Sequence, residues 1–195
     1  MSDRRSFLLT RLLPALVLGL SLAAGLALWM GRGSGPAFPG IGGPFQLTAQ
    51  DGQPFTDARL AGKPSLIFFG YTHCPDVCPT ALFQVSEVLK ALGPDAKANA
   101  VFVTVDPERD TPKVLAEYLS SFDPRIVGLT GDRAQVDAML RAYRVYSKKN
   151  PGANGDYAMD HSALVYLIDK AGRFVGGFNL ERPPNEAAAQ LRAMS

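Results

Sequence analysis

Residues 65–79 have the sequence SLIFFGYTHCPDVCP, in which a short apolar run leads directly into the two cysteines of the chain. The continuous apolar run over residues 65–71 predicts a strand buried on both faces of a sheet. An amphipathic helix is expected next, because the apolar residues of 81–92 fall on one helical stripe. Cys74 and Cys78 therefore lie between a buried strand and a helix, where α/β sheets expose functional groups.

The rest of the pattern extends this strand and helix into one α/β domain. A small hairpin is expected at 45–56, where Asp51-Gly52 suits a tight turn. Apolar runs predict further strands at 100–105, 126–129, 163–169 and 173–178. Helical periodicity predicts three further helices: one that begins after a cap at Asp110 or Thr111, one over 132–145 and one over 185–194. This order predicts a mixed sheet flanked by helices on both faces. It fits a thioredoxin-like fold and also a small doubly wound sheet, and topology alone does not separate them.

The amino-terminal residues have the composition of a membrane segment. Residues 12–30, LLPALVLGLSLAAGLALWM, contain no charged residue, and at a helical rise of about 1.5 Å per residue they nearly cover a hydrocarbon core of roughly 30 Å. Arginines lie mostly before this run, so the positive-inside tendency places residues 1–11 in the cytoplasm. We expect residues 12–30 to be a transmembrane anchor crossing a bacterial inner membrane once, residues 31–43 a flexible linker, and residues 44–195 a periplasmic domain. A cleaved signal peptide and a twin-arginine signal stay open as alternatives, and both would also export the domain.

The charge balance gives no case for nucleic acid as a partner. The formal net charge is +2, and residues 1–32, with four arginines and one aspartate, contribute +3. The remaining chain is therefore close to −1, and the basic excess belongs to the amino terminus rather than to a nucleic-acid surface.

Two prolines determine the geometry expected for Cys74 and Cys78. A residue before proline avoids helical dihedrals, so both cysteines are expected to be extended. Pro79 suits the first position of a helix, which makes Cys78 the expected cap. The helix dipole would then lower the pKa of the Cys78 thiol and favour its thiolate.

Three kinds of site fit this cysteine pair. A structural disulfide would stabilise little, because it would close a very short ring. A thiol–disulfide redox centre usually leaves two residues between its cysteines, and here there are three. A soft-metal site needs more ligands than two thiolates, and copper accepts imidazole together with sulfur. We favour the metal site and keep the redox centre open.

The chain contains two histidines, so the search for a further ligand is short. His73 adjoins Cys74, but neighbouring side chains in an extended segment point to opposite faces, so a surface role is expected for it. His161 lies at the start of the predicted strand 163–169, which in a thioredoxin-like fold faces the cysteine loop. A thioredoxin would have a cis-proline there, whereas residues 159–162 are Met-Asp-His-Ser. An imidazole in that place favours a metal over generic dithiol exchange.

Several motifs together resemble those of the Sco/SenC family, in the same order and spacing from about residue 45 to 178. They are GYTHCPDVCPT at 70–80, VDPERDTP at 105–112, GLTG at 128–131, and DHS at 160–162 followed by YLID at 166–169. The resemblance implies a thioredoxin-like domain that delivers copper to the copper site of cytochrome c oxidase subunit two, or keeps the cysteines of that site reduced. It implies Cys74, Cys78 and His161 as ligands of Cu(I) or Cu(II), and a copper donor protein as a second partner.

Two functions from different classes follow. The first is a copper chaperone, which is not an enzyme in the turnover sense and which would release the metal when Cys74 and Cys78 oxidise to a disulfide. The second is a thiol–disulfide oxidoreductase that uses the same two cysteines as its redox-active pair.

Other residues near the site have weaker candidate roles. Asp76 could orient a partner or tune the site electrostatically, or be a turn residue, and residues 106–110 are expected to form loop structure and a helix cap, with partner recognition as the alternative. A hydrogen bond from the His161 ring to Asp160 and a thioether ligand at Met159 are not favoured.

Overall fold

The computed structural model describes residues 40–95 and 97–195. The predicted anchor at 12–30 and most of the predicted linker lie outside the described residues. Within the described part, no helix is long and apolar enough to cross a membrane. Ile41 packs against the core, and the Gly42 backbone N–H donates to the Ala142 carbonyl O at 2.8 Å.

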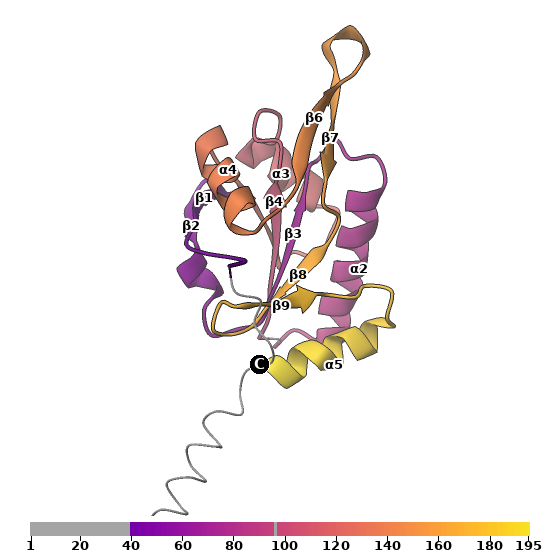
Figure 1. The fold of residues 1–195 in the computed structure, drawn as a ribbon. Helices are drawn as coiled ribbons and strands as arrows, with labels where there is room; N and C mark the ends of the chain where they lie inside the picture. Colours follow the sequence, from indigo (N-terminus) through magenta and orange to yellow (C-terminus); the bar gives the residue numbers. More distant parts are fainter. Residues whose placement is uncertain (1–39, 96) are drawn as a thin grey trace, which may run out of the picture. The chain divides into compact units, whose positions relative to one another are not determined.

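A seven-stranded mixed sheet forms the centre of the domain, with strand order β2-β1-β5-β4-β3-β8-β9 (Figure 1). The strands β3, β4 and β5 are parallel, whereas β8 runs antiparallel to β3 and β9 antiparallel to β8. Their bounds are β1 Gln46–Ala49, β2 Pro54–Thr56, β3 Ser65–Gly70, β4 Asn99–Thr104, β5 Ile126–Thr130, β8 Val165–Ile168 and β9 Phe174–Gly177. The predicted strands are confirmed, with ends that differ by one or two residues.

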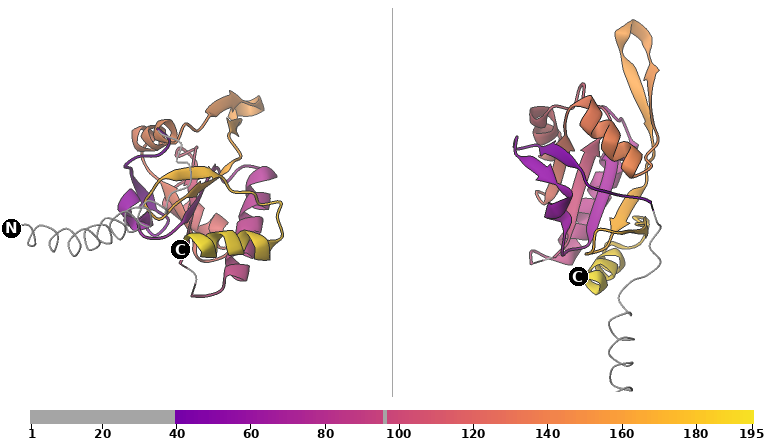
Figure 2. Two further views of the ribbon diagram at one scale, coloured as in Figure 1. Left: turned by 60° about the horizontal axis from the view of Figure 1, so that its bottom comes forward. Right: turned by 60° about the vertical axis from the view of Figure 1, so that its left-hand side comes forward.

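Alternating side chains of the central strands divide the core into two layers. Ile67 and Phe69 of β3 pack on one face with α4 (Arg133–Ala142), whereas Leu66 and Phe68 pack on the other face. That second face is covered by α2 (Val77–Leu92), α3 (Pro112–Leu119) and α5 (Pro184–Met194). Helices therefore cover both faces of the sheet, which is the thioredoxin-like arrangement that we predicted (Figure 2).

The start of α2 differs from the prediction. Asp76, not Cys78, is the residue that precedes the helix, and Val77 is its first residue. Cys78 therefore lies inside the first turn, and the expectation of an extended Cys78 before Pro79 is wrong. Proline is tolerated throughout a first helical turn, because the N–H groups there have no partner within the helix.

A second, two-stranded sheet was not predicted. It is a hairpin of β6 (Ser147–Pro151) and β7 (Tyr157–His161), which projects from the domain in Figures 1 and 2. The sequence of β6, SKKNP, has no alternating apolar pattern, and Met159 is the one buried residue of β7, so neither strand gives a clear apolar signal. His161 is accordingly the last residue of β7, and the strand predicted over 163–169 begins only at Val165.

Candidate metal centre

Cys74 lies in the loop between β3 and α2, and hydrogen bonds to the buried carboxylate of Asp110 hold this loop in place. The Cys74 backbone N–H donates to the Tyr71 carbonyl O at 3.2 Å, which turns the chain after β3. Asp110 accepts from the backbone N–H of Thr72 at 3.1 Å, from its Oγ1 at 2.6 Å, and from Thr104 Oγ1 at 2.6 Å. Burial raises the pKa of Asp110, although these hydrogen bonds act in the opposite direction. Asp110, expected to cap a helix or to take part in partner recognition, thus fixes the loop before Cys74 to the sheet.

Cys78 is buried in the first turn of α2, directly above the end of β3. A Cβ at Gly70 would lie only 2.6 Å from Cys78 Sγ, so the absence of a side chain at Gly70 makes room for the thiol. Burial raises the pKa of the Cys78 thiol, and the neighbouring Cys74 adds to the increase. The predicted low pKa of Cys78 is wrong, because the loss of solvation outweighs the favourable helix dipole.

His161 reaches the cysteines from the end of β7. Its Nδ1 lies 3.1 Å from the Ser162 carbonyl O, and a carbonyl only accepts, so Nδ1 has the proton. Its Nε2 is then unprotonated in the neutral ring and lies 3.5 Å from Cys78 Sγ. Nε2 accepts from the Cys78 thiol, and a backbone acceptor on one ring nitrogen with an unprotonated second nitrogen is the usual state of a histidine that binds a metal. Tyr71 packs edge-on against the ring at 5.7 Å and limits its rotation.

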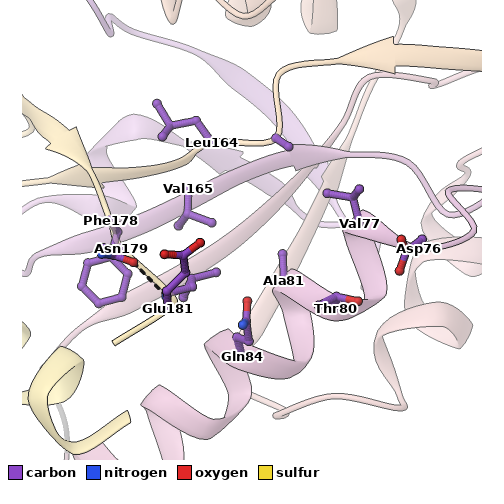
Figure 3. A pocket seen from close by; sticks show the side chains of 12 residues that line it. Asp76, Val77, Thr80, Ala81, Gln84, Leu164, Val165, Phe178, Asn179 and Glu181 are labelled. Atoms are coloured by element: carbon purple, nitrogen blue, oxygen red, sulfur yellow. Dashed lines mark hydrogen bonds between the residues drawn. The ribbon is translucent and has the colours of Figure 1, made fainter. Parts of the chain in front are cut away.

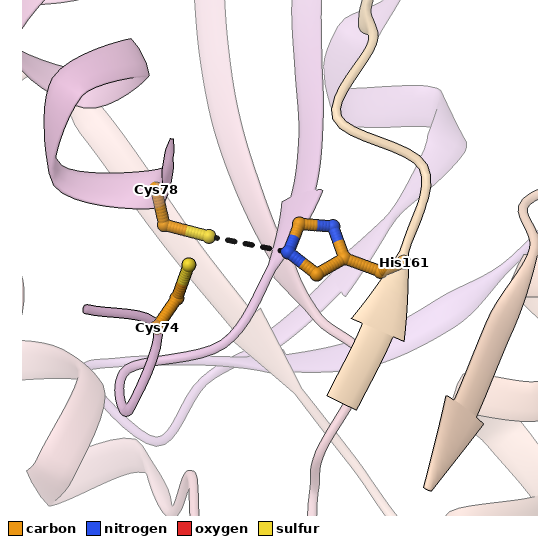
Figure 4. Close-up of side chains that lie close together, drawn as sticks. All are labelled: Cys74, Cys78 and His161. Carbon is orange, nitrogen blue, oxygen red and sulfur yellow. Dashed lines mark hydrogen bonds between the residues drawn. The ribbon is translucent and has the colours of Figure 1, made fainter. Parts of the chain in front are cut away.

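These three side chains form a compact group of possible metal ligands (Figure 4). Cys74 Sγ, Cys78 Sγ and a ring nitrogen of His161 all lie within 4.8 Å of one another. Metal bonds to sulfur and nitrogen are roughly 2.0–2.3 Å long, so donors on one ion are separated by roughly 3.5–4.5 Å. Both cysteines are free thiols, Cys78 buried and Cys74 half-buried. Two sulfurs and one imidazole suit copper and other soft metals, and the tertiary structure brings together the residues singled out from the sequence.

The other candidate residues lie outside this group. His73 is exposed, and its Nδ1 is 3.1 Å from Thr72 Oγ1. Asp160 is exposed on the hairpin, and the His161 ring uses the Ser162 carbonyl in its place. Met159 is buried in the core on the α4 face of the sheet.

A cluster around Arg109 holds the base of the hairpin and was missed by the sequence reasoning. Arg109 Nε donates to buried Asp106 at 2.5 Å, and Arg109 Nη1 donates to the Tyr157 carbonyl O at 3.0 Å. The guanidinium lies 3.6 Å from the centre of the Tyr157 ring, and the Tyr157 hydroxyl donates to Asp106 at 2.8 Å. Glu108 binds Lys149 of β6 at 2.6 Å. The motif at 105–112 therefore ties β6 and β7 to the sheet, and β7 ends in His161.

Comparison with known proteins identifies the family. A family model described as SCO1/SenC matches residues 35–195. The chain belongs to the SCO1/SenC family. A solved family structure, "Structure of Bradyrhizobium japonicum ScoI with copper bound", is 62% identical with a TM-score of 0.78, covering 80% of this chain and 99% of its own.

Curated members of the family extend the comparison. The SCO2-like protein of Rickettsia felis is 42% identical over 78% of this chain and 76% of its own length. The mitochondrial Protein SCO1 homolog of Mus musculus is 40% identical over 80% of this chain. The match spans only 56% of the mouse protein, so the chain corresponds to about half the length of that relative.

Proposed function

We propose that this chain binds copper through Cys74 Sγ, Cys78 Sγ and His161 Nε2. The observation that supports this most strongly is the group of three donors within 4.8 Å, assembled from a loop, a helix and a separate hairpin. Copper in the Bradyrhizobium relative supports the choice of metal. Binding would release the thiol protons, and the positive ion would compensate for the unfavourable burial of the Cys78 thiolate.

We further propose that the copper is cargo, delivered to the copper site of cytochrome c oxidase subunit two while that oxidase is assembled. Another solved structure, 20% identical, is named as a member of "the Sco family of cytochrome c oxidase assembly proteins". Transfer is favoured by the half-buried Cys74, which a partner's ligands can approach first. Under this proposal residues 12–30 hold the domain at the outer face of the bacterial inner membrane, and a separate copper protein supplies the metal.

A thiol–disulfide reductase is the second candidate, supported by two free thiols in close contact. In that reaction the Cys74 thiolate attacks a partner disulfide, Cys78 then attacks the mixed disulfide, and the partner leaves as a dithiol. Cys74 is the expected nucleophile, because Cys78 is buried and its pKa is raised. The redox roles of the two cysteines are thus the reverse of those expected from the helix dipole.

Anaerobic copper titration of the reduced protein tests the copper proposal. We expect one copper per chain and a thiolate-to-Cu(II) charge-transfer band. Cys74→Ala, Cys78→Ala and His161→Ala should each weaken binding more than about 100-fold, since even changes in residues that support ligands cost roughly 10- to 100-fold. His73→Ala is the matched control, because its exposed ring lies outside the donor group, and it should bind as the parent does. Parent-like binding by His161→Ala would contradict the proposed ligand set and leave the reductase as the better account.

A further inference from the structure

An open groove of about 370 Å³ is lined by residues that are close in sequence to the three donors, although no donor lines it. One wall is the start of α2, and the other walls are residues 163–165 and 178–181 (Figure 3). Asp76 and Val77, which separate the two cysteines, line the groove, as does Leu164, three residues after His161. A molecule seated in the groove would therefore lie next to the donor group.

Exposed apolar side chains gather around this part of the domain. Four large apolar side chains are strongly exposed among the described residues, and two of them, Val77 at 46% and Leu164 at 44%, line the groove. A third, Tyr146 at 57%, is next to His161, because its backbone exchanges hydrogen bonds with Ser162. Apolar side chains exposed together at one place mark a binding surface rather than random surface composition.

The groove also has an acidic character. Figure 3 shows Asp76 at the start of α2 and Glu181 on the wall formed by residues 178–181. No lysine or arginine of the described chain pairs with either carboxylate. Two exposed, unpaired negative charges that flank an apolar floor are complementary to a segment with apolar side chains between basic ones.

We propose that the groove binds an extended segment of the protein that receives copper, with apolar side chains on Val77 and Leu164 and a lysine or arginine toward Asp76 and Glu181. The inference rests on the proposed copper transfer, and it adds the chemistry by which the acceptor is recognised. A segment bound here holds the acceptor's own ligands beside the half-buried Cys74, so that transfer takes place within one complex.

A model peptide tests the groove directly. The probe is a fluorescein-labelled hexapeptide in which two lysines flank leucine and valine residues, and its counterpart has glutamates in place of the lysines. Fluorescence anisotropy is measured with the full chain in a non-ionic detergent. Leu164→Ser should weaken binding of the lysine peptide about 10-fold, because the peptide loses its apolar contact with the Leu164 side chain. Glu181→Lys should weaken it about 5-fold, because one exposed charge pair becomes repulsive.

Matched controls separate the groove from general surface effects. Phe83→Ser removes an exposed apolar side chain on α2 that does not line the groove, and Glu117→Lys makes the same charge change on α3. Both should bind the lysine peptide within twofold of the parent. The inference is overturned if the lysine peptide does not bind, if the glutamate peptide binds equally well, or if the groove variants behave like their controls. It is also overturned if sedimentation shows a dimer that Leu164→Ser dissociates, because a second copy of the chain would then occupy the groove.

Copper titration of the same samples distinguishes the two proposals. The groove variants leave Cys74, Cys78 and His161 unchanged, so one copper per chain is expected in each. Normal copper binding with no peptide binding would overturn the groove alone. Failure of the parent to bind copper would overturn the proposed function.

Discussion

Gly70→Ala tests the site without changing any proposed ligand. An added Cβ would lie 2.6 Å from Cys78 Sγ and 2.8 Å from a ring carbon of Phe102. Both neighbours are fully buried in the same core layer, so neither can move into solvent. Overpacking at such a position costs about 1–3 kcal/mol, which for a domain of this size is a fall in Tm of roughly 3–10 °C. Part of that strain is relieved if Cys78 Sγ moves away from Cys74 and His161.

The assay measures both consequences on the reduced protein without oxygen. Thermal unfolding followed by circular dichroism should show the lower Tm, and competition with a Cu(I) chelator should show copper affinity lowered at least about 10-fold, the range found when support of a ligand is lost. Gly43→Ala is the control, since its new Cβ would have no neighbour closer than 3.8 Å. A Gly70→Ala protein with the parent's Tm and copper affinity would refute the reasoning that Cys78 is held by close packing against β3.

Two further substitutions test the supports of the site. Arg109→Lys retains the charge but loses the planar guanidinium that joins Asp106 to Tyr157. We expect faster amide hydrogen exchange over residues 147–161 and copper affinity lowered about 3- to 10-fold. Parent-like exchange would contradict the role of Arg109 in holding the hairpin. Asp110→Asn tests the buried carboxylate through pH. Since the pKa of Asp110 is raised in the folded state, its ionisation destabilises the protein as the pH rises from about 4 through the folded value. Urea unfolding from pH 3.5 upward should therefore show a loss of stability in the parent that the variant lacks, by up to about 1.4 kcal/mol per pH unit, and identical slopes would contradict this assignment.

Local sequence patterns were sufficient to predict most of the sheet and its helices. The side chains of β3 pack into both core layers and those of α2 into one, so the continuous apolar run of β3 and the helical stripe of α2 are visible in the sequence. Thr111 and Pro112 at the start of α3 were predictable for the same reason, because capping is a local interaction. The hairpin of β6 and β7 was missed, since Met159 is its one buried side chain, and contacts with Arg109 and Glu108, which are distant in sequence, hold its base.

The three donors come from separate parts of the chain, so local patterns do not determine their arrangement. The sequence by itself determined the types of donor and the short spacing of Cys74 and Cys78. His161 was reached from the sequence only through the thioredoxin-like fold and the family resemblance. The tertiary structure brings its Nε2 within 3.5 Å of Cys78 Sγ, 83 residues away, since β3 and α2 hold the cysteines while a separate hairpin supplies the ring. The tertiary structure also decides the protonation of Cys78. A helix dipole can be inferred from the sequence, whereas burial depends on the packing against Gly70 and the sheet, and burial has the larger effect on the pKa of this thiol.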